Sequence, residues 1–209
     1  MNLLVNGRQA FVATGGREFD ASQPAVVLIH GAGFDHTAWA LHSRWFAHNG
    51  FSVLVPDLPG HGRSAGPTLS SIAEMADWTA ALLSATGATK AHLIGHSMGS
   101  LIALETAARH PDKVSALGLI GTAASMTVGP DLLKAAEAND QAAIDMVSIW
   151  GLGFSAELAA AWRQACGCMA VRSARFSKAR PACCIPISPP ATPMPTHWRQ
   201  PRRCACRPR

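Results

Sequence analysis

The sequence contains no tyrosine, and its six cysteines all lie after residue 165. The first 165 residues can therefore form neither disulfides nor cysteine-based metal sites. No run of about 18 apolar residues occurs, so we expect no membrane-spanning helix. The start, Met1–Arg8, lacks the long apolar stretch of a secretory signal peptide. These absences predict a cytoplasmic protein, and the length of 209 residues suits one domain.

Acidic residues are absent from the last 52 residues. Residues 1–157 hold 8 basic and 13 acidic residues, whereas residues 158–209 hold 10 basic residues and no acidic one. All the cysteines and eight of the 14 prolines also lie in the second part, which shows no helical or strand periodicity. The pI of about 9.1 therefore reflects this tail. We expect residues 158–209 to be disordered or out of frame.

Three hypotheses account for this tail. A natural basic tail could bind nucleic acid or an acidic surface. A metal-binding tail is the second, although its C-x-C and C-C pairs differ from the C-x2-C spacing of zinc sites. We favour the third, a shift of the reading frame near Leu158. Codons allowed for residues 182–200, read one base earlier, can encode acids, a tyrosine and a helical pattern, all of which the tail lacks.

The segment AHLIGHSMGS, residues 91–100, places G-x-S-x-G between a short apolar run and a helical pattern. A strand, a tight turn and a helix in this order form a nucleophile elbow, which exposes the serine hydroxyl above the sheet. The turn has no room for side chains at its two flanks, and this explains Gly95 and Gly99. Two more apolar runs, residues 25–29 and 52–56, lead into the turns HGAG and PDLPGHGRS.

These three motifs, in this order and spacing, resemble the serine-nucleophile branch of the α/β-hydrolase fold family over roughly residues 20–157. The resemblance implies that Ser97 attacks a carbonyl carbon and forms an acyl-enzyme. It implies an oxyanion hole made by the backbone N–H groups of Met98 and Ala32. Gly31 and Gly33 would let the backbone approach the substrate, and the helix from residue 98 to about 110 would direct its dipole there.

Several of these residues also have structural interpretations. Ser97 could be an ordinary helix N-cap. We interpret His30 as anchoring a loop, Asp57 as organising the PDLPGHGRS turn, and His96 and His61 as structural. The side chains at positions 34 and 98, a phenylalanine and a methionine, could line an acyl pocket or belong to the core.

The rest of the pattern predicts an α/β fold with a mostly parallel sheet covered on both faces. We expect a hairpin in residues 1–24 around Asn6-Gly7, and a helix over 36–48 with Trp39 and Trp45 on its inner face. A second helix is expected within 68–86, with Ser70 or Ser71 near its start, and a further strand over 114–120. Residues 1–125 would form an incomplete hydrolase core, and the helical runs of 126–157 the start of a cap.

The family's order of catalytic residues is serine, then an acid, then histidine. The acid and the base have no counterpart here, and His197, among prolines and basic residues, is the only histidine after His110. The chain is therefore expected to be truncated or frameshifted after about residue 157.

The resemblance implies a serine hydrolase acting on a small-molecule ester, thioester, lactone or amide, with no cofactor and no metal. The first alternative is a catalytically inactive relative. The second is a binding protein that uses the basic tail, although nucleic acid is not the expected partner of the hydrolase itself. The sequence leaves the oligomeric state and the identity of the substrate open.

Overall fold

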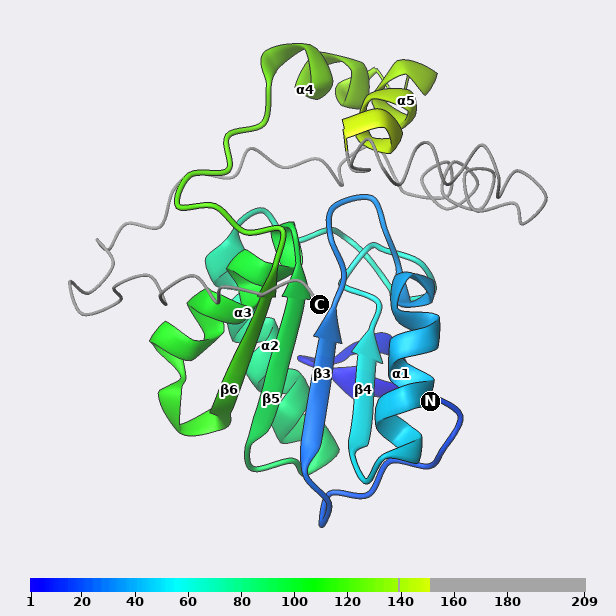
Figure 1. Ribbon diagram of the computed structural model, residues 1–209, viewed down its shortest axis with the longest axis vertical. Helices are drawn as coiled ribbons and strands as arrows, with labels where there is room; N and C mark the ends of the chain where they lie inside the picture. Colours follow the sequence, from blue (N-terminus) through cyan, green and yellow to red (C-terminus); the bar gives the residue numbers. More distant parts are fainter. Residues whose placement is uncertain (139, 151–209) are drawn as a thin grey trace, which may run out of the picture.

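The computed structural model describes residues 1–138 and 140–150. Six strands form one mixed sheet in the order β1-β2-β4-β3-β5-β6 (Figure 1). Strands β3 to β6 run parallel, and the hairpin β1-β2 pairs antiparallel with the edge of β4. The bounds are β1 Asn2–Val5, β2 Arg8–Ala13, β3 Ala25–Ile29, β4 Ser52–Pro56, β5 Ala91–His96 and β6 Val114–Ile120.

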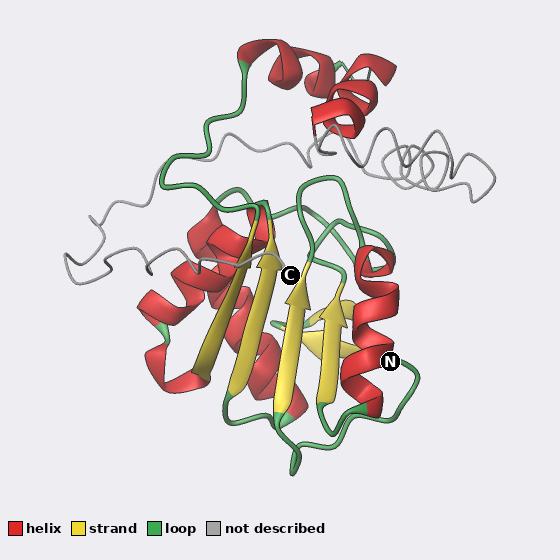
Figure 2. Ribbon diagram, viewed as in Figure 1, coloured by secondary structure: helices red, strands yellow, loops and turns green. Residues whose placement is uncertain are grey.

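Helices cover both faces of this sheet (Figure 2). These are α1 Ala40–His48 on one face, and α2 Ile72–Thr86 and α3 Met98–Arg109 on the other. Two further helices, α4 Pro130–Glu137 and α5 Gln141–Trp150, lie beyond the carboxyl ends of the strands. Strand β3 shows why two layers are needed. Its alternate residues Val27 and Ile29 belong to the core with α2 and α3, while Val26 and Leu28 belong to a second core with Trp39 and Ala47. The predicted α/β fold with a covered, mostly parallel sheet is confirmed.

Local sequence signals account for the element boundaries. Asn6 and Gly7 both have positive φ, 50° and 74°, as a type I′ hairpin turn requires. Helix α2 begins with a capping box, in which the Ser71 hydroxyl accepts from the Glu74 N–H and the Glu74 carboxylate accepts from the Ser71 N–H. It ends at Gly87, which has a φ of 77°. Both predicted elements are confirmed.

The segment 36–48 differs from its prediction in two respects. It forms a short 3-10 helix, His36–Trp39, followed by α1. Trp39 is buried as predicted, but the expected inward position of Trp45 is wrong, since this side chain is 59% exposed. The change of helical pitch at residue 39 rotates the later residues relative to a single continuous helix.

Strand β6 lies at the edge of the described sheet and is unusually open. Leu119 and Ile120 are 39% and 48% exposed. The predictions for residues 158–209, including their disorder and their possible metal or nucleic-acid ligands, concern residues outside those that the structure describes.

We expect the expressed chain to self-associate through β6, because an exposed apolar edge strand can pair with another chain. Leu119→Lys should lower the apparent molar mass in gel filtration with light scattering. Leu41→Lys is the matched control, since Leu41 is 81% exposed but lies on α1. Equal association of both variants and the parent chain would contradict a role for this edge.

Candidate functional site

Ser97 lies at the junction of β5 and α3. Its backbone conformation is one that residues other than glycine rarely adopt. Its φ is 53° and its ψ is −122°. It is one of two non-glycine residues with positive φ among the described residues; the other is the turn residue Asn6. The Ser97 N–H donates to the carbonyl of Ile120 at 2.9 Å, which ties the turn to the end of β6. Strain of this kind is typical of functional sites.

The glycines at both flanks of the turn are required by close backbone contacts. A Cβ built on Gly95 would lie 2.0 Å from the Gly99 carbonyl oxygen, and one built on Gly99 would lie 2.3 Å from the carbonyl oxygen of Ile29. Neither contact leaves room for a methyl group. Glycine at both of these positions therefore allows α3 to begin in direct backbone contact with β5 and β3.

The hydroxyl of Ser97 does not cap the helix. Helix α3 begins instead through the Ser97 carbonyl, which accepts from the Ser100 N–H at 2.8 Å and from the Ser100 hydroxyl at 2.5 Å. Ser97 thus occupies the N-cap position of α3 but lacks the side-chain hydrogen bond and the extended backbone of an ordinary N-cap.

The loop after β3 reaches the turn at Ser97. A Cβ built on Gly31 would lie 3.3 Å from the Cβ of Ser97, so the two segments are in direct contact. Gly33 has a φ of 73°, which brings the loop back on itself. Within residues 1–138 and 140–150, the backbone N–H groups of Ala32 and Met98 donate no hydrogen bond. The structure therefore places two free backbone donors on the two segments that meet at Ser97.

The side chains beside these donors differ in their surroundings. Met98 is buried and belongs to the core beneath the sheet's α2–α3 face. Phe34 is half-buried in the loop after β3, and its N–H donates to the Gly31 carbonyl at 3.2 Å. Of the two interpretations left open for Met98, the structure favours the core.

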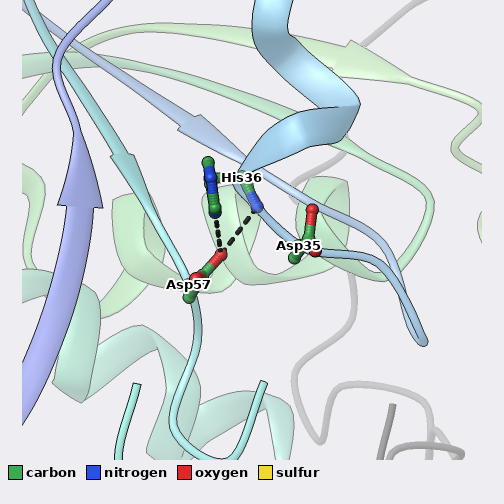
Figure 3. Close-up of side chains that lie close together, drawn as sticks. All are labelled: Asp35, His36 and Asp57. Carbon is green, nitrogen blue, oxygen red and sulfur yellow. Dashed lines mark hydrogen bonds and ion pairs between the residues drawn. The ribbon is translucent and has the colours of Figure 1, made fainter. Parts of the chain in front are cut away.

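Asp57 organises the turn after β4, as the sequence predicts (Figure 3). Its carboxylate is fully buried and accepts from the His36 N–H at 2.7 Å, from His36 Nδ1 at 2.8 Å and from the Arg63 N–H at 2.8 Å. Burial alone would raise the pKa of Asp57, but these hydrogen bonds, first that of the His36 ring, hold it below its usual value. Asp57 thus joins the loop after β3 to the turn after β4.

Among the described residues, a group of side chains that could together bind a metal ion lies at this turn. Ligand atoms of Asp35, His36 and Asp57 lie within 4.8 Å of one another. However, the Asp35 carboxylate caps the 3-10 helix by accepting from the N–H and hydroxyl of Thr37, and both Asp57 oxygens already accept hydrogen bonds. These hydrogen bonds make the cluster part of the network that joins the loop after β3 to the turn after β4.

His30 and His61 lie buried beneath this network, with ring centroids 5.1 Å apart. His30 anchors the loop as predicted, since its ring contacts both the Gly31 carbonyl, at 2.8 Å, and the Leu58 N–H, at 3.1 Å. Burial lowers the pKa of both histidines, that of His30 to about 4. Both are neutral and structural, and neither is exposed to act as a base.

We expect the free energy of unfolding to fall as the pH is lowered from about 6.5 towards 4. In the fold both histidines have lowered pKa values, whereas in the unfolded chain they titrate near 6.5. The unfolded state therefore binds more protons in this interval, and stability decreases as the pH falls. The shift of His30 corresponds to roughly 3 kcal/mol. Urea unfolding from pH 7 to pH 4 measures this loss, and constant stability would contradict it.

A sequence model of the alpha/beta hydrolase fold family matches residues 24–157. The chain belongs to this family. The match ends at residue 157, which is also the last acidic residue of the chain.

Several curated proteins are similar to this chain over part of its length. It is 43% identical over 105 residues to the pimeloyl-(acyl-carrier protein) methyl ester esterase of Chromobacterium violaceum, a match that covers 47% of this chain and 37% of the relative. It is 37% identical over 97 residues to the dihydrolipoyllysine-residue acetyltransferase component of the acetoin cleaving system of Cupriavidus necator, covering 46% of this chain and 25% of the relative. The chain thus spans less than half of the length of these relatives.

Among solved structures, the enol-lactonase of Burkholderia xenovorans has the same fold. It aligns with a TM-score of 0.68 at 24% identity, over 87% of this chain and 69% of the lactonase. Among the helices that the structure describes, none has both the length and the hydrophobicity that a membrane crossing needs.

A cavity of about 600 Å³ lies away from the turn at Ser97. It is lined by residues of the hairpin, of the loop before β3 and of the end of α2: Met1, Leu3, Thr14, Gly16, Arg17, Glu18, Phe19, Ala85 and Thr86. None of the candidate residues contributes to it, so this cavity is not the acyl pocket expected from the sequence.

Proposed function

We propose that this protein is a serine hydrolase in which Ser97 is the nucleophile. The observation that carries the proposal is the strained backbone of Ser97, whose hydroxyl is not used to cap α3. The hydroxyl oxygen attacks the carbonyl carbon of a substrate and forms a tetrahedral intermediate. The intermediate then expels its leaving group as an alcohol, which takes up the proton that the Ser97 hydroxyl has lost, and becomes an acyl-enzyme; water hydrolyses this to the acid and regenerates the serine hydroxyl.

The proposed oxyanion hole consists of the N–H groups of Ala32 and Met98. Both are free of hydrogen bonds to the described residues, and they belong to the two segments that meet at Ser97. The N-terminus of α3 begins at Met98, so the helix dipole adds to the stabilisation of negative charge. Donors fixed in place before the reaction stabilise the oxyanion without reorganisation.

The proposed substrate class is an ester or a related small acyl compound. A serine nucleophile supports acyl transfer, and the curated relatives include a methyl ester esterase. Thioesters, lactones and amides react through the same acyl-enzyme. Helices α4 and α5 lie beyond the carboxyl ends of the strands, the end at which Ser97 sits (Figure 1). We assign residues 126–157 to the start of a cap over the serine, following a core of residues 1–125.

Full turnover needs an acid and a base that the family's order places after the serine. His197 lies outside the described residues, and its sequence context does not match that of a base. Loss of triad members lowers turnover by about 10⁴ to 10⁶, leaving catalysis by the oxyanion hole and by binding. We therefore propose a test of the reactivity of the serine itself, which does not require full turnover.

A fluorophosphonate probe tests the nucleophile, because it reacts with serine hydroxyls beside an oxyanion hole. We expect a covalent adduct that mass spectrometry maps to Ser97 and that disappears in Ser97→Ala. Ser115→Ala is the matched control, because Ser115 is an exposed serine on β6. Its labelling should equal that of the parent chain. A folded parent chain that is not labelled would contradict the proposed function.

A further inference from the structure

His30 connects the loop that carries Ala32 to the turn after β4. Its side chain is fully buried and makes two hydrogen bonds. One joins Nδ1 to the Gly31 carbonyl oxygen at 2.8 Å, and the other joins Nε2 to the Leu58 N–H at 3.1 Å. The ring therefore bridges two segments that are 27 residues apart in the chain, counted from Gly31 to Leu58.

The partners of His30 determine which nitrogen carries the proton. A backbone N–H can only donate, so Nε2 must present its lone pair to Leu58. A carbonyl oxygen can only accept, so Nδ1 must carry the hydrogen and donate it to Gly31. Both bonds are satisfied only by one neutral tautomer. Burial favours that neutral form, since it lowers the pKa of His30 to about 4.

The Gly31 carbonyl belongs to the same peptide unit as the Ala32 N–H. This peptide is trans, and in a trans peptide the C=O and the N–H point in opposite directions within one plane. An anchor on the carbonyl oxygen therefore sets the direction of the N–H. That oxygen accepts two hydrogen bonds, one from His30 Nδ1 and one from the Phe34 N–H at 3.2 Å. Hydrogen bonds to the carbonyl also polarise the peptide and strengthen its N–H as a donor.

We propose that His30 is a positioning residue, which orients the Gly31–Ala32 peptide so that the Ala32 N–H points at the oxyanion formed on Ser97. The proposal rests on the function proposed for Ala32 and Ser97. His30 does not touch the substrate, since its ring is buried and both nitrogens are engaged. It acts only through the peptide that it holds.

Other titratable groups surround His30 and are unchanged in the test. His61 packs against its ring, and Asp57 and Asp35 act on it from the turn after β4 and the loop after β3. His36 is hydrogen-bonded to Asp57. The variants are therefore compared at one neutral pH.

Two substitutions separate the two hydrogen bonds of His30. In His30→Asn the amide NH₂ lies near the position of Nδ1 and retains the donor to Gly31. In His30→Gln the amide oxygen lies near the position of Nε2 and retains the acceptor for Leu58. Each variant therefore loses one of the two bonds, so their thermal stabilities should fall by similar amounts.

The measurement is the second-order rate of fluorophosphonate labelling at Ser97, with melting curves of each variant. We expect His30→Gln to label about 10- to 100-fold more slowly than the parent chain, approaching the loss caused by removing an oxyanion donor. His30→Asn should stay within about threefold of the parent chain. A merely structural role would lower both rates alike or in proportion to stability. Equal rates in the two variants, or a slower His30→Asn, would overturn the proposal.

Nuclear magnetic resonance keeps this test separate from that of the nucleophile. If the parent chain is not labelled, the proposed function fails, but the ring and the Ala32 amide still report on His30. In the parent chain we expect a slowly exchanging proton on Nδ1 of His30 and none on Nε2. This measurement needs no variant. We also expect the Ala32 amide resonance to move in His30→Gln and to stay near its parent position in His30→Asn. A proton on Nε2, or an unmoved Ala32 amide in His30→Gln, would overturn the proposal.

Discussion

Gly99→Ala should destabilise the fold by about 3 kcal/mol or more and abolish labelling of Ser97. The added Cβ would lie 2.3 Å from the Ile29 carbonyl oxygen and 2.7 Å from that of His30. These atoms are backbone, so the clash is relieved only if α3 moves away from β3. Overpacking in a well-packed core typically costs 1–3 kcal/mol, and this contact with backbone lies at or beyond the upper end.

The expected fall in melting temperature is about 10 °C for a domain of this size. Thermal melts followed by circular dichroism measure it. Gly129→Ala is the matched control, because nothing lies within 4 Å of a Cβ built there and its φ is −61°. It should melt within about 2 °C of the parent chain. If both glycine variants melt alike, the close approach of α3 to β3 does not determine the G-x-S-x-G spacing.

Asp57→Asn should destabilise the fold by about 3 kcal/mol, although it removes only one charge. The amide oxygen can replace only one carboxylate oxygen, so its NH₂ group faces either the Arg63 N–H or the two His36 donors, and at least one buried donor loses its partner. Breaking a buried ion pair or leaving a buried polar group unsatisfied has effects of this size. Urea unfolding at pH 7 measures the loss.

Asp77→Asn is the matched control for Asp57. Asp77 pairs with Arg109 at 2.7 Å, but both side chains are nearly half exposed. Asp77→Asn should therefore lower the free energy of unfolding by less than about 1 kcal/mol. The two sites also differ in their response to acid. Because the pKa of Asp57 is lowered in the fold, its contribution is present above the ordinary aspartate pKa and lost as the pH falls below it. The free energies of unfolding of the parent chain and of Asp57→Asn should therefore converge in strong acid. If Asp57→Asn and Asp77→Asn lower the stability at pH 7 equally, the stabilising role of the Asp57 network is contradicted.

The features that could be predicted from the sequence depend on neighbouring residues. The Asn6-Gly7 turn, the capping box at Ser71 and the end of α2 at Gly87 are each set within a few positions of the chain. Buried parallel strands give continuous apolar runs, as in β3 and β4. The elbow is predictable for the same reason, since its strand, turn and helix are contiguous.

The features that the sequence did not reveal depend on contacts between distant segments. His36 was expected only as the start of a helix, yet its ring and its N–H both bind Asp57, 21 residues away. The Ser97 N–H is held by Ile120 from another strand, and no local pattern indicates that bond. Trp45 was misplaced because the 3-10 turn before α1 changes the helical phase. Arg63 lies over the Phe11 ring at 3.8 Å, a contact between the turn after β4 and the hairpin.

A crystal structure of the protein after reaction with a fluorophosphonate would test the roles of Ser97, Ala32 and Met98 together. The phosphonyl oxygen occupies the position of the oxyanion in the tetrahedral intermediate. We predict a covalent bond to the Ser97 hydroxyl oxygen, with the phosphonyl oxygen about 2.7–3.1 Å from the N–H nitrogens of both Ala32 and Met98. An adduct on another residue, or a phosphonyl oxygen directed away from these two donors, would contradict the account.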